Sequence, residues 1–340
     1  RHLLAASAGL ALSGCATPSH ERTVLVNLAE GDRTETASPS SAASLATGAD
    51  EFSRMTVPVR LNGLGPFEFV VDTGANRTVV ADQLAAMLGL PDSGMADVHG
   101  IVGVESHRTS LIERLEADSL VARRIRAPNL PRDRMGADGL LGVDVLRNRM
   151  VTLDFVNRRL RIGAPSRNGP PQSSFDMRLA AASSPAASLG DPVVVSARYR
   201  FGQLIVVDCE IRGQRVTAFM DSGSQSTVAN LSLRRLIAAG TSDQNVNPNR
   251  GRLLTPLLSA TGQTSEGEVG PLPPLRIGGL TLTGLNVVFA DLHVFDLWRL
   301  QNSPAILIGI DVMRRFNALQ LDFAGRQVLF YPAGPLPRFR

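Results

Sequence analysis

Two of the Asp-(Thr or Ser)-Gly triplets in the chain follow apolar runs, and each of these two copies places a carboxyl group in a segment that favours a tight turn. With the residue that follows each, the copies are Asp72-Thr73-Gly74-Ala75 and Asp221-Ser222-Gly223-Ser224. Two carboxyl groups held close together cannot both ionise easily, so they share one proton and titrate as a pair. The ionised group can then take a proton from water while the protonated group stabilises a developing oxyanion. Such a pair can catalyse hydrolysis without a metal or a covalent intermediate.

Either triplet alone is weak support, because an Asp followed closely by Gly also forms ordinary turns. The surrounding pattern is more specific. Each triplet ends an apolar run, and two apolar residues followed by a glycine recur 70 residues after Asp72 and 88 residues after Asp221, at Gly142 and Gly309. Because both copies share this arrangement, the sequence predicts that the triplets occupy equivalent places in two related units.

The segments around the triplets repeat, as expected of a duplicated unit. Alternating β-branched and apolar residues, divided by a glycine-bearing turn, predict a β-hairpin before each triplet. The hairpins are predicted over 55–61 with 66–71 and over 204–211 with 215–220. Further matches pair the short helical patterns 82–88 and 231–239, and the segments 140–146 with 307–313 and 151–155 with 319–323. We therefore expect two similar β-rich lobes.

With these motifs the chain resembles the retropepsin-like aspartic peptidases, in particular a bacterial form that carries two lobes on one chain. The resemblance covers roughly 54–163 and 203–331. It implies an all-β fold of two pseudo-symmetric β-barrel lobes with short helices and an active-site cleft between the lobes. It also implies an endopeptidase with Asp72 and Asp221 as the catalytic pair, no metal and no cofactor. In the family the Thr73 and Ser222 hydroxyls would bond across the two loops, and Gly74 and Gly223 would hold the tight backbone positions.

The resemblance further implies that glycine-tipped hairpins, called flaps, cover the substrate. The flap candidates are Gly100, Ile101, Val102 and Gly103 in the first lobe, and Thr261 and Gly262 in the second. Neither segment contains the flap tyrosine that is typical of pepsins, since the only tyrosines are Tyr199 and Tyr331. This departure favours the retropepsin-like branch over the pepsin-like one.

The two loops differ after the glycine, where Ala75 in the first lobe corresponds to Ser224 in the second. A hydroxyl at Ser224 could donate to Asp221 and favour its ionised form, which would leave Asp72 as the carrier of the shared proton. The same hydroxyl could instead face solvent or its own backbone. The sequence leaves both interpretations open.

The first residues resemble a bacterial lipoprotein signal. Arg1 and His2 precede an apolar run over 3–12 that is too short to span a bilayer but fits an export signal, and the run ends in Ser13-Gly14-Cys15. Lipidation of Cys15 would anchor the protein in the bacterial cell envelope, facing the periplasm. The composition then predicts a signal peptide over 1–15, a flexible tether over 16–50, lobe 1 over 51–163, an interlobe linker over 164–192 and lobe 2 over 193–340.

Composition argues against other functions. All 35 basic residues are arginines, the net charge is +4, and the arginines are scattered with few aromatic residues near them, so we expect no nucleic-acid binding. The five histidines lack the spacing of a zinc site. Cys209 lies in an apolar run and is expected to be a core residue.

Three arrangements remain compatible with the sequence. The first is a monomeric peptidase whose own lobes pair, which is anchored to a membrane by its N-terminal lipid and acts on a protein or peptide substrate. The second is a peptide-binding or scaffold lipoprotein that keeps the fold without catalysis. In the third, each lobe pairs with a lobe of another chain. Intact triplets in both lobes favour the first over the second.

Overall fold

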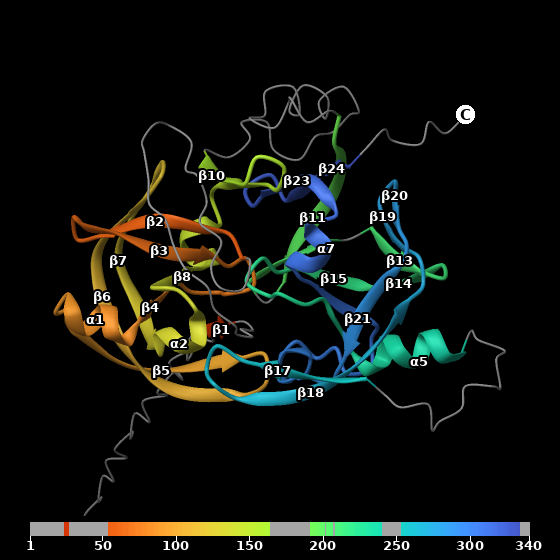
Figure 1. Cartoon of the computed structure of the whole chain (residues 1–340), viewed down its shortest axis with the longest axis horizontal. Helices are drawn as coiled ribbons and strands as arrows, with labels where there is room; N and C mark the ends of the chain where they lie inside the picture. The colour runs from red at the N-terminus through yellow and green to blue at the C-terminus, as the bar shows by residue number, and fades with distance from the viewer. Residues whose placement is uncertain are drawn as a thin grey trace, which may run out of the picture.

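The computed structural model, shown in Figure 1, describes residues 24–26, 54–163, 191–200, 202–206, 208–239 and 253–333. The predicted signal peptide with Cys15, most of the predicted tether and nearly all of the predicted linker lie outside these residues. Strands make up most of the described chain and the helices are short. None of the described helices is long and apolar enough to cross a bilayer.

The first lobe is built around a closed barrel. Its six strands are β2 (Thr56–Leu61), β3 (Leu64–Val71), β4 (Val79–Ala81), β6 (Val104–Ala117), β7 (Leu120–Leu130) and β8 (Gly139–Leu141). They follow the order β6-β2-β3-β8-β4-β7, and pairing of β6 with β7 closes the ring. Alternate residues of β2 (Val57, Val59 and Leu61) are fully buried, because a strand sends successive side chains to opposite faces. The barrel therefore follows from the alternating apolar pattern.

Further elements surround this barrel (Figure 1). Strand β5 (Asp92–Gly100) pairs with β6, and the short β1 (Val24–Val26) runs parallel to β5. The helices of this lobe are α1 (Asp82–Met87), α2 (Arg132–Met135) and α3 (Val143–Leu146). Helix α1 confirms the helical pattern predicted over 82–88.

The second lobe repeats the strand arrangement of the first, except that four of its strands form a separate sheet. Its main sheet follows the order β12 (Gln203–Val206), β15 (Thr217–Met220), β22 (Ala305–Ile308), β16 (Val228–Ala229), β21 (Leu285–Phe289), β18 (Thr264–Leu272) and β17 (Leu254–Leu258). A separate sheet has the order β14 (Gln214–Arg215), β13 (Cys209–Ile211), β19 (Leu275–Ile277) and β20 (Leu280–Leu282). The helices are α5 (Leu231–Ala239), α6 (His293–Leu297) and α7 (Ile310–Met313).

The predicted hairpin of 204–211 with 215–220 is confirmed, but its first strand is divided into β12 and β13. The chain leaves the main sheet after β12, and β13 pairs instead with β14 and β19. Cys209 and Ile211 are buried in this second sheet, and burial raises the pKa of the Cys209 thiol to about 12. Val206 and Cys209 are both buried although they lie three residues apart, so the alternation shifts by one residue at the break. Cys209 is a core residue, as the sequence predicts.

A sheet shared by both halves joins the lobes. Its strands are β10 (Arg159–Gly163), β9 (Met150–Asp154), β23 (Phe316–Asp322), β24 (Gln327–Pro332) and β11 (Val193–Arg200), in that order. Pairing of β11 with β12 makes it continuous with the main sheet of the second lobe. The duplicated segments meet here, because β9 pairs antiparallel with β23 and aligns Leu153 with Leu319. Two copies of one segment that pair antiparallel are related by an approximate two-fold axis, so the two lobes face each other.

Candidate active site

The triplets that begin at Asp72 and Asp221 each follow the end of a strand that pairs with a parallel neighbour. Strand β3 runs parallel to β8, and β15 runs parallel to β22. At the strand ends the Asp72 amide donates to the Leu141 carbonyl at 3.0 Å, and the Asp221 amide donates to the Ile308 carbonyl at 3.0 Å. After each glycine of the partner strand the chain turns back to the triplet loop, with the Val143 amide 2.8 Å from the Ala75 carbonyl. The repeated sequence motifs therefore form equivalent structures in the two lobes, in which the residue after each glycine binds back to the triplet loop.

The two triplet loops contact each other through their hydroxyl residues. The Thr73 hydroxyl donates to the Met220 carbonyl at 2.8 Å and accepts from the Ser222 amide at 3.0 Å. In the reciprocal arrangement, the Ser222 hydroxyl donates to the Val71 carbonyl at 2.6 Å and accepts from the Thr73 amide at 3.2 Å. Four hydrogen bonds between buried groups thus fix one loop against the other, as predicted for Thr73 and Ser222.

Backbone amides hold each carboxyl group in the same way. Oδ1 of Asp72 accepts from the Gly74 and Ala75 amides, both at 2.9 Å. Oδ1 of Asp221 accepts from the Gly223 amide at 3.0 Å and the Ser224 amide at 3.1 Å. Both aspartates are 0% exposed. The fold therefore fixes both carboxyl groups in equivalent orientations, one from each lobe.

The Asp72 carboxyl group lies directly against the loop that carries Asp221. A Cβ atom added to Gly223 would come within 2.3 Å of Cγ of Asp72 and within 2.4 Å of both its oxygens. Glycine is required at this position because the carboxyl group of the other lobe occupies the space of a side chain. The structure thus brings together Asp72 and Asp221, with Thr73, Gly74, Ala75, Ser222, Gly223 and Ser224 around them.

The environment favours one shared proton. Burial, followed by the negative charge of Asp72, raises the pKa of Asp221 well above its usual range. The Gly223 and Ser224 amides and the positive charge of Arg54 act in the opposite direction on that pKa and do not outweigh burial. A carboxyl group that stays protonated beside a second carboxyl group can donate a proton at a pH where an isolated Asp is ionised.

Of the two interpretations of the Ser224 hydroxyl, the structure contradicts donation to Asp221 and supports a bond to its own backbone. This hydroxyl donates to the Ser226 carbonyl at 2.9 Å, so it binds its own backbone segment, and only the Ser224 amide reaches Asp221. The raised pKa of Asp221 also runs against the predicted preference for its ionised form. The difference between Ala75 and Ser224 therefore gives no reason to assign the shared proton to Asp72.

Arg54 is a charged residue beside the site that the sequence did not reveal. Its side chain is only 1% exposed, and its guanidinium donates to the Gly223 carbonyl at 3.3 Å and to the Met135 carbonyl. It thereby connects the first lobe to the Asp221 loop and places a positive charge near the carboxyl pair. Nothing in the spacing of the chain's arginines distinguishes this one, so only the fold identifies it.

In each lobe a threonine and an aspartate bind near the triplet loop, and the sequence repeat could have identified them. The Thr78 hydroxyl donates to Asp144 at 2.8 Å, and the Thr227 hydroxyl donates to Asp311 at 2.6 Å. The same threonine hydroxyls accept from the amides of Gly142 and Gly309, the glycines that follow β8 and β22. Asp144 and Asp311 lie two residues after these glycines in both repeats, and that match is the signal in the sequence.

The flap candidates of the two lobes lie against each other. A Cβ atom on Gly100 would come within 2.1 Å of the Ser259 hydroxyl, and the Gln263 amide group donates to the Val104 carbonyl at 3.3 Å. Val102, Gly103, Thr261 and Gly262 belong to the same two hairpin tips, which connect β5 to β6 and β17 to β18. In Figure 1 these hairpins meet along the lower side of the molecule. The hairpin tip of one lobe therefore contacts the hairpin tip of the other.

The first-lobe tip is also fixed to the second lobe. Ile101 is buried in an apolar cluster of the second lobe that includes Phe219 and Trp298, whose rings stack at 4.0 Å. Next to it, His99 Nδ1 lies 3.0 Å from His293 Nε2. Ile101 therefore contributes to a core as well as to a flap candidate.

Comparison with protein families agrees with this geometry. The sequence model of a family described as aspartyl protease matches residues 57–145 and again residues 207–312, which together exceed half of the chain. No curated protein matches the chain. Within the described residues no three His, Cys, Asp or Glu side chains are grouped in a way that could hold a metal ion. Each match contains one triplet, the parallel strand beside it and the glycine that follows that strand. The chain therefore belongs to the aspartyl protease family and carries the family's domain twice.

Proposed function

We propose that the protein is an aspartic endopeptidase in which Asp72 and Asp221 activate a water molecule to hydrolyse peptide bonds. The observation that carries this proposal is the pair of buried carboxyl groups, each held by two backbone amides. Four hydrogen bonds between the loop of Thr73 and the loop of Ser222 bring the two groups together. Two carboxyl groups fixed in this way can act as an acid–base pair on a water molecule and a peptide carbonyl.

The proposed chemistry uses the two carboxyl groups in complementary states. The ionised carboxylate removes a proton from water as the water oxygen attacks the peptide carbonyl carbon. The protonated carboxyl group donates a hydrogen bond to the carbonyl oxygen, which becomes negatively charged. The C–N bond then breaks as the nitrogen takes a proton from the pair, which restores one shared proton. The raised pKa of Asp221 supports this cycle, because one member keeps a proton above the usual pKa of an Asp.

The substrate is proposed to bind as an extended segment beneath the two hairpin tips. An extended peptide pairs its backbone with neighbouring strands, so recognition of the main chain requires little from any one side chain. Gly100, Ile101, Val102 and Gly103 from the first lobe, with Thr261 and Gly262 from the second, would cover it. Because the tips touch each other and both aspartates are fully buried, the tips have to separate before a substrate binds.

The test is cleavage of a peptide library over a range of pH, with and without a pepstatin-type inhibitor. Asp72→Asn and Asp221→Asn are the test variants, and Asp82→Asn, which changes an exposed carboxyl group outside the site, is the matched control. We expect cleavage by the wild type and the control, and none by the other two variants. If both Asn variants cleave as fast as wild type, the proposal is wrong. If wild type binds peptides and cleaves none, the chain is instead a peptide-binding protein on this fold.

We also propose that Cys15 carries a lipid that anchors the protein in a bacterial cell envelope, on the periplasmic side. The support is the apolar run over 3–12 followed by Ser13-Gly14-Cys15. Labelling with a radioactive fatty acid, in wild type and in Cys15→Ser, tests it. Equal labelling of the two proteins would contradict the assignment.

A further inference from the structure

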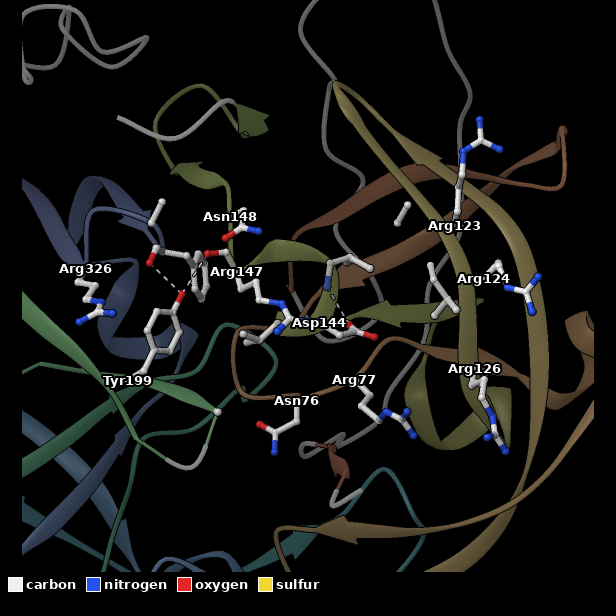
Figure 2. Close-up of a pocket in the computed structure, with 17 residues that line it drawn as sticks. Asn76, Arg77, Arg123, Arg124, Arg126, Asp144, Arg147, Asn148, Tyr199 and Arg326 are labelled. Carbon is white, nitrogen blue, oxygen red and sulfur yellow. Dashed lines mark hydrogen bonds between the residues drawn. The ribbon is translucent and has the colours of Figure 1, made fainter. Parts of the chain in front are cut away.

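We propose that an arginine-lined cavity between the two halves binds an acidic segment of a polypeptide. The cavity has a volume of about 950 Å³ and is shown in Figure 2. The first half contributes Asn76 and Arg77 of the loop after Asp72, part of β7 and the α3 region, and the second half contributes Tyr199, Gly202 and the turn between β23 and β24. The two aspartates of the proposed catalytic pair are not among its lining residues.

The cavity concentrates positive charge. Six of its seventeen lining residues are arginines: Arg77, Arg123, Arg124, Arg126, Arg147 and Arg326. Arginine makes up only about a tenth of the whole chain, whose net charge is +4. The lining contains a single carboxyl group, that of Asp144, which already accepts hydrogen bonds from Thr78 and the Val145 amide. The local excess of positive charge is therefore larger than the net charge of the entire protein.

Five of the six cavity arginines have no carboxylate partner among the described residues. Arg123, Arg124, Arg126, Arg147 and Arg326 are exposed, and in the described part of the chain none of these five forms an ion pair with a carboxylate. Arginines elsewhere on the surface do have such partners, for instance Arg108 with Asp92 and Arg276 with Glu210. An incoming anion would thus not have to displace a carboxylate from those five side chains.

The arrangement of the arginines favours an extended ligand. A guanidinium presents a planar fork of donors that matches a carboxylate. In Figure 2 the arginines are spread across the cavity, from Arg326 on one side to Arg123 and Arg126 on the other, and do not converge on one point. One compact anion would contact few of them. A polypeptide segment with several spaced Asp or Glu side chains can meet several, and a cavity of about 950 Å³ leaves room for it.

The cavity is connected to the loop of the first aspartate. The Gln203 side-chain amide donates to Oδ1 of Asn76, which lines the cavity, and to the Gly74 carbonyl, both at 2.7 Å. A substrate whose acidic segment occupies the cavity would therefore be held close to the proposed catalytic pair. This use of the cavity as a substrate-docking site rests on the proposed function, whereas binding itself does not.

Binding is tested with a fluorescein-labelled peptide that contains spaced glutamates and a matched peptide with glutamines in their place. The protein is the full chain with Asp72→Asn, which prevents cleavage. The test variant adds Arg123→Gln, Arg147→Gln and Arg326→Gln. The control adds Arg108→Gln, Arg132→Gln and Arg276→Gln, which removes the same charge from exposed arginines outside the cavity. Fluorescence anisotropy gives Kd, and thermal unfolding confirms that both variants fold.

We expect the glutamate peptide to bind the test variant about tenfold more weakly than it binds the parent protein. Its Kd for the control variant should lie within about twofold of its Kd for the parent. Each exposed charge pair contributes little to binding, but several together add up. Added salt weakens binding because it screens exposed charges. Equal binding of the two peptides, equal losses in both variants, or no binding at all would overturn the proposal. So would competition by inorganic pyrophosphate at the same concentrations as the glutamate peptide, because that indicates a site for a compact anion.

A second measurement separates this proposal from the proposed function. A peptide that wild type cleaves is extended with either the glutamate or the glutamine sequence. Docking predicts a KM about tenfold lower for the glutamate form, and loss of that difference in the arginine test variant with kcat unchanged. If wild type cleaves nothing but binds the glutamate peptide through the cavity, the proposed function fails and the cavity proposal stands. If cleavage occurs with equal KM values, the docking role fails.

Discussion

The closest contact between the lobes at the carboxyl pair can be tested by adding a single methyl group. Gly223→Ala would place a Cβ atom 2.3 Å from Cγ of Asp72. The Asp72 side chain has little room to move, because Oδ1 is held by the amides of Gly74 and Ala75. Gly279→Ala is a matched control, since a Cβ atom there meets its nearest neighbour, a methyl group of Val193, at 4.0 Å.

The size of the effect follows from this geometry. Normal contact begins at about 3.4 Å, so the Asp72 carboxyl group or the Gly223 backbone has to shift by about 1 Å. A shift of this size at reacting groups lowers the rate by about 10²-fold. Overpacking of a buried site costs about 1–3 kcal/mol of the free energy of unfolding. For a protein of this size each kcal/mol lowers Tm by about 2–4 °C, so we expect Tm to fall by roughly 2–12 °C.

Two assays measure these effects on Gly223→Ala, Gly279→Ala and wild type. Cleavage of a fluorogenic peptide gives kcat and KM, and a thermal scan gives Tm. We expect the loss in kcat for Gly223→Ala alone, with Gly279→Ala within about twofold of wild type. If Gly223→Ala folds with an unchanged Tm and cleaves within threefold of wild type, the carboxyl group of Asp72 does not fill the space beside Gly223 and the inferred geometry is wrong.

Three other predictions concern the charges and hydroxyls at the site. Arg54→Met should move the alkaline limb of the kcat/KM–pH profile to higher pH, because the positive charge of Arg54 lowers the pKa of Asp221, whereas Arg54→Lys should leave the limb nearly in place. Asp221→Asn should raise Tm at pH 7 and lose this advantage below about pH 4. The reason is that a carboxyl group whose folded pKa is raised stabilises the fold only while it is protonated. Equal Tm differences between the variant and wild type at pH 3 and pH 7 would contradict this. Thr73→Val and Ser222→Ala should each lower the free energy of unfolding by about 1–3 kcal/mol, and a denaturation double-mutant cycle should give a coupling of about 0.5–3 kcal/mol; simple additivity would mean that the two hydroxyls act independently.

The repeated parts of the fold were predictable because the sequence shows them twice. The alternating run before Asp72 predicted strands β2 and β3, and the recurrence of Gly142 and Gly309 predicted equivalent places for the two triplets. The contacts of Thr73 and Ser222 followed from the family resemblance and are present. These features depend on local patterns, or on a pattern that two segments share.

The features that were missed depend on contacts between distant segments. The pairing of β13 with β19 cannot be read from periodicity, because the alternation of Cys209 and Ile211 fits a strand without naming its partner. The Ser224 hydroxyl could reach its own backbone or Asp221, and the side-chain rotamer decides between them. Arg54 is one of 35 arginines, and only the fold encloses it between two lobes. Local sequence therefore identified the carboxyl pair, but not the groups that adjust its charge.

The position of Ile101 limits how often the site is accessible. This side chain is 2% exposed among apolar residues of the opposite lobe, so withdrawing the hairpin tip returns an isoleucine to water at a cost of about 1.5–3 kcal/mol. The unliganded protein then spends only about 1–8% of its time with the tip withdrawn. A ligand that binds only that minor population has its apparent affinity reduced by roughly one to two orders of magnitude. Long peptide segments contact more of the protein and can offset such a loss of affinity, whereas short peptides cannot. The burial of Ile101 therefore discriminates between long and short peptide ligands.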